Sequence, residues 1–210
     1  MTTPIKIGRM LRAGTTGFIV GCRVDQLDVP RFGGLVRAPV ADSYQIYGLI
    51  YDIHIDDDGL VRQLATAQNV DANTIADNRV HRNVPVEISA LSVGYEQNGE
   101  LKHLLPPRPP LSLDVIYKCS PSELCAFTTA GRLGYFRHVL RSADLPVGEL
   151  LAAHIEQAHA AHLSAGDPLW SKGAVNELIT LLRDDYAALM AVLGALSDAL
   201  GEGWKLGDAS

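Results

Sequence analysis

The chain has 210 residues, of which 47% are hydrophobic and 20% are charged, a composition typical of a folded protein. Its 18 Lys and Arg stand against 24 Asp and Glu, and this net charge of −6 disfavours a protein that wraps DNA or RNA through non-specific charge contacts. Apolar runs are shorter than the about 20 residues of a membrane span. Residues 1–12 lack the apolar core of a secretion signal, and the odd number of cysteines argues against a disulfide framework. We therefore expect a cytoplasmic protein.

Residues 1–118 carry the pattern of an antiparallel β domain, because short β-branched and aromatic runs alternate with turn residues. The Gly14–Gly17 segment predicts a plain turn. Asp58-Gly59 and Asn98-Gly99 predict two hairpin turns, since Gly supplies a positive φ at little cost. The strands expected here span residues 18–24, 35–40, 44–55, 60–65, 86–95, 101–105 and 111–117.

Two connections within this part are expected to lack strands. Residues 71–83 are polar and aperiodic, which predicts a long loop with room for a helical turn. Residues 106–110 read Pro-Pro-Arg-Pro-Pro and predict an extended link, because proline can neither donate to a β-ladder nor continue a helix.

Residues 119–210 predict a helical domain. Ser120-Pro121-Ser122-Glu123 is a capping box with proline at the first helical position, so a short helix should run from there to about Phe127. A second segment is expected over 131–142. A third helix should run from Leu145 to about Ser164, capped by Asp144 and ended by Gly166.

The last helix is expected to be long, from Ser171 to about Leu200, with Gly201 and Gly203 ending it. Its apolar stripe repeats with heptad spacing and should form an interface with a helix of this chain, of a second copy or of a partner. The stripe consists of Val175, Ile179, Leu182, Tyr186, Leu189, Leu193, Leu196 and Leu200. We expect a homo-oligomer or a tight partner complex, with a closed intramolecular bundle as the alternative.

The charges divide unequally between the two parts. Residues 1–118 hold 12 Lys and Arg against 13 Asp and Glu, a net charge of −1, and residues 119–210 hold 6 against 11, a net charge of −5. Within the acidic part, Arg132, Arg137 and Arg141 form a basic group that could contact an anion or a partner. The alternatives are a solvated face or pairing with the acidic last helix.

Residues that could carry chemistry are sparse. A P-loop is missing, which predicts that the chain does not hydrolyse ATP by itself. Cys119 and Cys125 lack the second close pair of a zinc site. His154, Glu156, His159 and His162 include the Glu-x-x-His spacing of di-iron bundles without its second copy, so we expect exposed or interface histidines and no metal or other cofactor.

The first part of the chain resembles the HAS barrel, the small six-stranded β-barrel that begins HerA-type hexameric DNA translocases and the alpha and beta subunits of rotary ATP synthases. The resemblance spans about residues 5–117. It rests on Ile7-Gly8-Arg9, the strand 18–24, Gly33-Gly34-Leu35-Val36, the run Ile46-Tyr47-Gly48-Leu49-Ile50-Tyr51-Asp52-Ile53 and the proline-rich exit at Leu105-Pro106-Pro107. It implies a barrel that packs into rings and docks partners. Where those families continue into an ATPase domain, this chain has helices.

The fold class expected is therefore α+β: an antiparallel β-barrel over 1–118 followed by a helical assembly domain over 119–210. The favoured function is a non-catalytic scaffold or accessory protein that binds itself or a protein partner, for example a HerA-type ATPase of a DNA-processing machine, and contacts nucleic acid only indirectly. One alternative is a barrel that stacks single-stranded nucleic acid on Tyr44, Tyr47, Tyr51 and Tyr95. Another is an enzyme with a site at the barrel–helix junction, built from the histidines or from Arg137 and Arg141.

Overall fold

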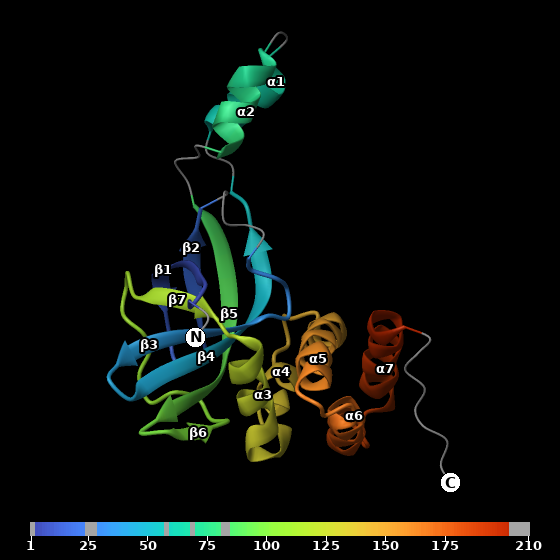
Figure 1. Cartoon of the computed structure of the whole chain (residues 1–210). Coiled ribbons are helices and arrows are strands. Elements are labelled where there is room, and N and C mark those ends of the chain that lie inside the picture. Colours follow the sequence, from blue (N-terminus) through green and yellow to red (C-terminus); the bar gives the residue numbers. More distant parts are fainter. Residues whose placement is uncertain (1–2, 24–28, 57–58, 68–69, 81–84, 202–210) are drawn as a thin grey trace.

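The computed structural model describes residues 3–23, 29–56, 59–67, 70–80 and 85–201. It confirms the expected fold class, because an antiparallel β-barrel precedes a set of helices (Figure 1). No described helix has the length and apolar character that would let it cross a membrane.

The barrel closes through one pairing between strands that are distant in sequence. The strands are β1 (Lys6–Ala13), β2 (Gly17–Cys22), β3 (Leu35–Ala41), β4 (Tyr44–His54), β5 (Val86–Gln97), β6 (Glu100–Lys102) and β7 (Val115–Lys118). Neighbours are hydrogen-bonded in the order β2-β1-β7-β3-β4-β5-β6, and β2 also pairs with β5. Six strands therefore form a closed ring, and β6 extends the end of β5 as a hairpin.

Local turn signals set several of these pairings as predicted. Asn98 and Gly99 adopt positive φ values of 54° and 80° between β5 and β6, as a tight hairpin turn requires. Gly14 donates its N–H to the carbonyl of Gly17, 2.8 Å away, in the turn between β1 and β2. The sequence pattern missed β1 as a strand, although closure of the barrel depends on it.

The barrel interior is filled by side chains. Its buried cluster consists of Ile7, Met10, Phe18, Val20, Cys22, Val36, Ala38, Tyr44, Ile46, Ile50, Val86, Ile88, Ala90 and Ile116. Gly48 lies where β4 passes the ring of Phe18, and a Cβ atom built at Gly48 would lie 2.5 Å from that ring. Glycine is required there because the Phe18 ring occupies the space that a side chain would need.

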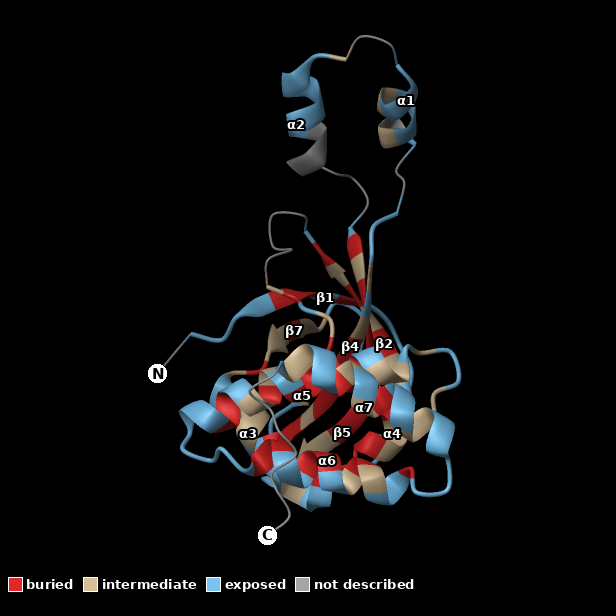
Figure 2. Ribbon diagram, turned by 90° about the vertical axis from the view of Figure 1, so that its right-hand side faces the viewer, coloured by how far each residue is buried: buried red, intermediate tan, exposed pale blue. Residues whose placement is uncertain are grey.

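The predicted strand at 60–65 is wrong, because these residues belong to helix α1 (Leu60–Thr66). At this end of β4, residues 52–54 pair with β5, whereas the β3 pairing ends at Leu49. Helix α2 (Ala72–Val80) occupies most of the expected loop. Figures 1 and 2 show α1 and α2 as an arm that projects from the barrel between β4 and β5.

The remaining helices follow β7. They are α3 (Pro121–Thr129), the 3-10 helix η2 (Ala130–Leu133), α4 (Phe136–Leu140), α5 (Val147–Ser164), α6 (Trp170–Leu181) and α7 (Tyr186–Leu200). The predicted capping box begins α3: the Ser120 hydroxyl accepts from the Glu123 N–H, and the Ser120 N–H donates to the Glu123 carboxylate. Asp144 does not cap α5 as expected, because α5 begins after Pro146 without a side-chain cap.

The single long helix expected over 171–200 is wrong, since the structure has two helices there. Leu182 ends α6, and Asp185 then begins α7 by accepting the N–H of Ala188 at 3.0 Å. The heptad pattern continues across this break, but each of the two helices contributes its own buried residues to the same helical core. Periodicity alone does not distinguish one helix from two that fold onto a common neighbour.

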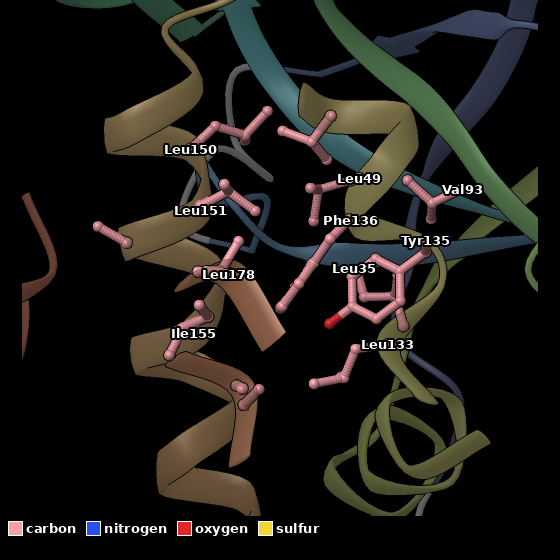
Figure 3. Packing of buried hydrophobic residues seen from close by; sticks show 14 of the residues in the cluster. Leu35, Leu49, Val93, Leu133, Tyr135, Phe136, Leu150, Leu151, Ile155 and Leu178 are labelled. Carbon is pink, nitrogen blue, oxygen red and sulfur yellow. The ribbon is translucent and has the colours of Figure 1, made fainter. Parts of the chain in front are cut away.

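The helices pack on the outer face of the barrel. Figures 2 and 3 show α5 and its neighbours beside β4 and β5, with the labelled Leu49 and Val93 of the barrel facing Phe136 and helix α5. This second core joins Leu35, Tyr47, Leu49 and Val93 of the strands to the buried residues of α3, α4, α5, α6 and α7. All seven strands lie before the boundary predicted at residue 118, together with α1 and α2, and one core spans the parts on either side of it.

We predict that Gly48→Ala lowers the free energy of unfolding by about 1–3 kcal/mol, because the added methyl group overpacks the barrel against Phe18. Gly173→Ala is the matched control, since a Cβ at this helical glycine meets nothing within 4 Å. That change should stabilise the protein by about 0.5–1 kcal/mol. Urea unfolding measures the free energy of unfolding of both variants. Equal changes in this free energy would contradict the packing described for β4.

Candidate functional site

The barrel–helix junction gathers three histidines that bond to partners on different elements. His154 comes from α5 and is completely buried. Its Nδ1 lies 3.0 Å from the Gly33 carbonyl and its Nε2 lies 2.8 Å from the Tyr135 hydroxyl. A carbonyl can only accept, so Nδ1 carries the proton and Nε2 accepts from Tyr135. His154 therefore ties the segment before β3 to α5 and to the start of α4.

Burial lowers the pKa of His154 to about 4, although the bond to Gly33 favours the charged form. The imidazole is neutral at pH 7, which suits a group with one donor and one acceptor already satisfied. Burial also raises the pKa of Tyr135 well above its ordinary value. The pair consequently holds no charge at neutral pH.

Gly33 makes the close approach between the barrel and α5 sterically feasible. Its φ is 75°, and a Cβ built on it would lie 2.7 Å from the backbone N of His154. Beside it, the Gln157 side chain donates to the Phe32 carbonyl at 2.9 Å. Two side chains of α5 thus hold two successive carbonyls of this loop.

A second histidine sits in an arrangement that superficially matches a catalytic triad. The Nε2 of His162 lies 2.7 Å from the Thr128 hydroxyl, and its Nδ1 lies 3.5 Å from an Asp167 carboxylate oxygen. The His162 ring also stacks on Trp170, with ring centroids 4.5 Å apart. Sequence reasoning missed this group because Thr128 and Asp167 lie far from each other along the chain.

The geometry of this group favours a structural role. The Thr128 hydroxyl donates to the Leu124 carbonyl at 2.8 Å, so it is placed to accept from His162 rather than to give up a proton to it. A nucleophile requires the reverse direction. Thr128 is also only 1% exposed, so a substrate has no path to its oxygen. The three residues instead connect α3 to the end of α5.

The third histidine, His103, follows β6 and is packed between aromatic rings. Its Nε2 lies 3.0 Å from the Phe127 carbonyl, and its ring contacts those of Phe127 and Tyr135. Burial lowers the pKa of His103. Its own carbonyl accepts from the guanidinium of Arg137 and from Nε2 of His138.

The histidines of α5 were expected to be exposed or at an interface, and for two of them this is wrong. His154 and His162 are buried inside the molecule because α5 lies between the barrel and α7 (Figure 1). His159 is half-buried and Glu156 is exposed. Among the residues that the structure describes, no three His, Cys, Asp or Glu side chains gather as metal ligands do. Cys22 and Cys119 are buried, Cys125 is half-buried, and none of the three forms a disulfide in the structure.

The arginines predicted to form one group have different environments. Arg137 is half-buried and bonded to the His103 carbonyl, while Arg132 and Arg141 are exposed. None of the four tyrosines that were proposed to stack bases is fully exposed. Tyr44 and Tyr47 are buried, and the Tyr47 hydroxyl donates to Glu96 at 2.9 Å. Burial and this bond raise the pKa of Tyr47.

The predicted apolar stripe is mostly covered within the chain. Val175, Leu182 and Leu196 are buried in the helical core, as the intramolecular alternative requires. The stripe's other large residues divide between half-buried and exposed. Ile179, Leu189, Leu193 and Leu200 pack partly against the core, whereas Tyr186 is 73% exposed.

A pocket of about 530 Å³ lies where the loop before α5 faces β4. Its walls combine apolar side chains with two exposed carboxylates. They are Phe32, Tyr51, Asp52, Ile53, Asp144, Leu145 and Pro146. No sequence pattern predicted this pocket, because its residues come from three separate segments of the chain.

Comparison with known family models and with curated proteins finds no match. The geometry of the chain is therefore the basis for its functional interpretation.

We predict that Gly33→Ala lowers the free energy of unfolding by about 2–5 kcal/mol, because it combines an unfavourable φ with a clash against α5. Gly59→Ala is the control: Gly59 has a similar φ of 70°, but a Cβ there meets nothing within 4 Å. It should cost only about 1–2 kcal/mol. Chemical denaturation measures the free energy of unfolding of both variants. A Gly33→Ala variant as stable as Gly59→Ala would show that the close contact between Gly33 and α5 does not constrain this position.

The low pKa of His154 predicts a loss of stability in mild acid. The folded form releases its proton at about 4, whereas an unfolded histidine has a pKa of about 6.5. Between these values the unfolded chain binds more protons, so the free energy of unfolding falls as pH drops from about 6.5 toward 4. This group contributes up to roughly 3 kcal/mol of that fall.

Urea titrations at several pH values between about 7 and 5 check this expectation. The control is His154→Gln, which should be less stable at pH 7 but should lose less stability on acidification. Identical slopes for the two proteins would show that His154 is not the group responsible.

Proposed function

We propose that the chain is a non-catalytic assembly protein, which joins macromolecules through the outer surfaces of its barrel and helices. The observation that carries the proposal is a contrast between inside and outside. His154 and His162 of the junction are bonded to partners inside the chain, whereas large apolar side chains project from both parts. Leu111 is 69% exposed on the barrel side and Tyr186 is 73% exposed on α7. Grouped exposed apolar side chains mark interaction surfaces.

The partner we propose is a HerA-type ATPase of a DNA-processing machine. Support for this partner comes from the resemblance of residues 5–117 to the HAS barrel, whose relatives assemble around such motors. The closed six-stranded barrel is consistent with that resemblance. Because this chain lacks a P-loop, its barrel would act as a stable binding platform in such a complex, and the partner would hydrolyse ATP.

The two alternative functions have less support. Stacking of single-stranded nucleic acid needs exposed aromatic faces, and Tyr44 and Tyr47 are buried. Catalysis at the junction needs an accessible nucleophile or base, and Thr128 and His154 are buried and already bonded.

We predict that the purified full chain co-elutes with the HerA-type ATPase of its own organism and does not hydrolyse ATP when alone. Size-exclusion chromatography with light scattering measures the complex, and phosphate release measures turnover. An unrelated P-loop ATPase is the control and should elute separately.

Fluorescence anisotropy with a labelled single-stranded oligonucleotide tests the alternative function. Tight, salt-sensitive binding of the oligonucleotide without binding of the ATPase would overturn the proposal. ATP turnover by the pure chain that one substitution abolishes would overturn it as well.

A further inference from the structure

One surface of the barrel combines exposed aliphatic side chains with cations. Strand β1 and the connection that enters β7 form it, and we call it the basic–apolar surface. It consists of Lys6, Arg9, Leu11, Arg12, Leu111 and Leu113. Leu111 is 69% and Leu113 is 66% exposed.

The backbone at Leu113 adopts a conformation that is costly for a leucine. Leu113 has a φ of 72°, which disfavours any residue with a Cβ. Its N–H donates to the Met10 carbonyl at 2.9 Å, and its carbonyl accepts from Arg9 at 3.0 Å. The Leu111 N–H donates to Asp114 at 2.8 Å. The hydrogen bonds around Leu113 maintain this strained backbone although its side chain is exposed and apolar. Backbone strain that is maintained in this way is often found at binding sites.

A second exposed apolar surface lies on α7. This helix is apolar on nearly every side, a pattern typical of a helix covered all round, yet only Val192 and Leu196 are fully buried. Its outer face exposes Tyr186, Ala187, Met190, Ala191 and Gly194. Two large side chains thus border small residues that allow a partner to approach closely.

The two surfaces carry opposite charge. Lys6, Arg9 and Arg12 outnumber the neighbouring Glu87, which pairs with Arg12, and Asp114. By contrast, α7 has no Lys, Arg or His, and the acidic residues Asp184, Asp185 and Asp198 lie beside or on it. Arg183, which precedes the helix, is paired with Asp184 at 3.3 Å. Among the described residues, the charged groups at α7 therefore sum to −2 and those at the barrel surface to +1.

Topology places the two surfaces on opposite sides of the molecule. Around the closed barrel, β4 lies three strands from β1 in either direction. The helices cover the β4 side, and α7 lies beyond α5 (Figure 1). Because the two surfaces lie on opposite sides, they cannot contact each other within one chain. They also cannot contact each other in a two-fold symmetric dimer, in which the same patch of both copies forms the interface.

We propose that a second copy of this chain binds head to tail, with the α7 outer face of one copy on the basic–apolar surface of the next. This inference rests on the proposed assembly function and names the partner at these two surfaces. Such an interface leaves one free surface of each kind at the ends, so the assembly extends or closes into a ring.

Two variants that each block one surface test the proposal. Leu111→Glu places a carboxylate against the acidic α7 of the next copy, and Gly194→Trp places a bulky ring on the α7 outer face, where a Cβ meets nothing within 4 Å in the free chain. Both positions are exposed, so the fold should persist, as circular dichroism can verify. Ile75→Glu, on the projecting arm, is the matched control.

Light scattering is expected to give a mass above 22.6 kDa for the native chain and for Ile75→Glu, and the monomer mass for each blocked variant. Mixing the two blocked variants should restore association, but only to a one-to-one dimer, because each supplies the surface that the other lacks. Raised salt should reduce the mass of the native assembly.

A monomeric native chain would overturn the inference, and so would a native oligomer whose blocked variants remain monomeric when mixed, since that result indicates one self-complementary patch. A monomeric chain that still binds the HerA-type ATPase would contradict head-to-tail assembly and leave the proposed function standing.

Discussion

The apolar outer face of β4 and β5 is the constraint on which the rest of the structure depends. A barrel strand normally buries alternate residues, but buried side chains occur on both faces of β4 between Tyr44 and Ile50. One set fills the barrel, while Tyr47 and Leu49 point outward and need another layer. The helices after β7 supply that layer, so barrel and helices stabilise each other across a single core.

Polar groups caught in this junction must find partners, because burial without a hydrogen bond is costly. Histidine suits the task, since its neutral ring donates at one nitrogen and accepts at the other. His154 uses both nitrogens between Gly33 and Tyr135, and His162 bonds Thr128 while stacking on Trp170. The hydrogen bonds of these two histidines thus connect structural elements, although their arrangement resembles that of a catalytic site. The outer surfaces are the parts of the molecule that can bind partners.

Two signals that act within a few residues were predictive. Asn98-Gly99 and the Ser120–Glu123 capping box formed as expected, because their hydrogen bonds and φ values are local. The cap expected at Asp144 did not form. Signals that depend on distant neighbours were not predictive: the segment after Gly59 is a helix and not a strand, and the heptad stripe did not reveal the break before Asp185.

The candidate site was the least predictable part. Periodicity placed His154 and His162 on one helix correctly, but it did not show that α5 is covered on both sides. The Thr128 and Gly33 partners come from other elements and became visible only in three dimensions. Leu111 and Leu113 were expected within a strand over 111–117, but β7 begins only at Val115, and a turn before it presents both leucines.

Barrel and helices should unfold as one cooperative unit, because the β4–β5 face and the buried histidines join them. Differential scanning calorimetry of the full chain can test this. We expect one unfolding transition whose calorimetric enthalpy equals its van't Hoff enthalpy. Two separate transitions, one from the barrel and one from the helices, would contradict it.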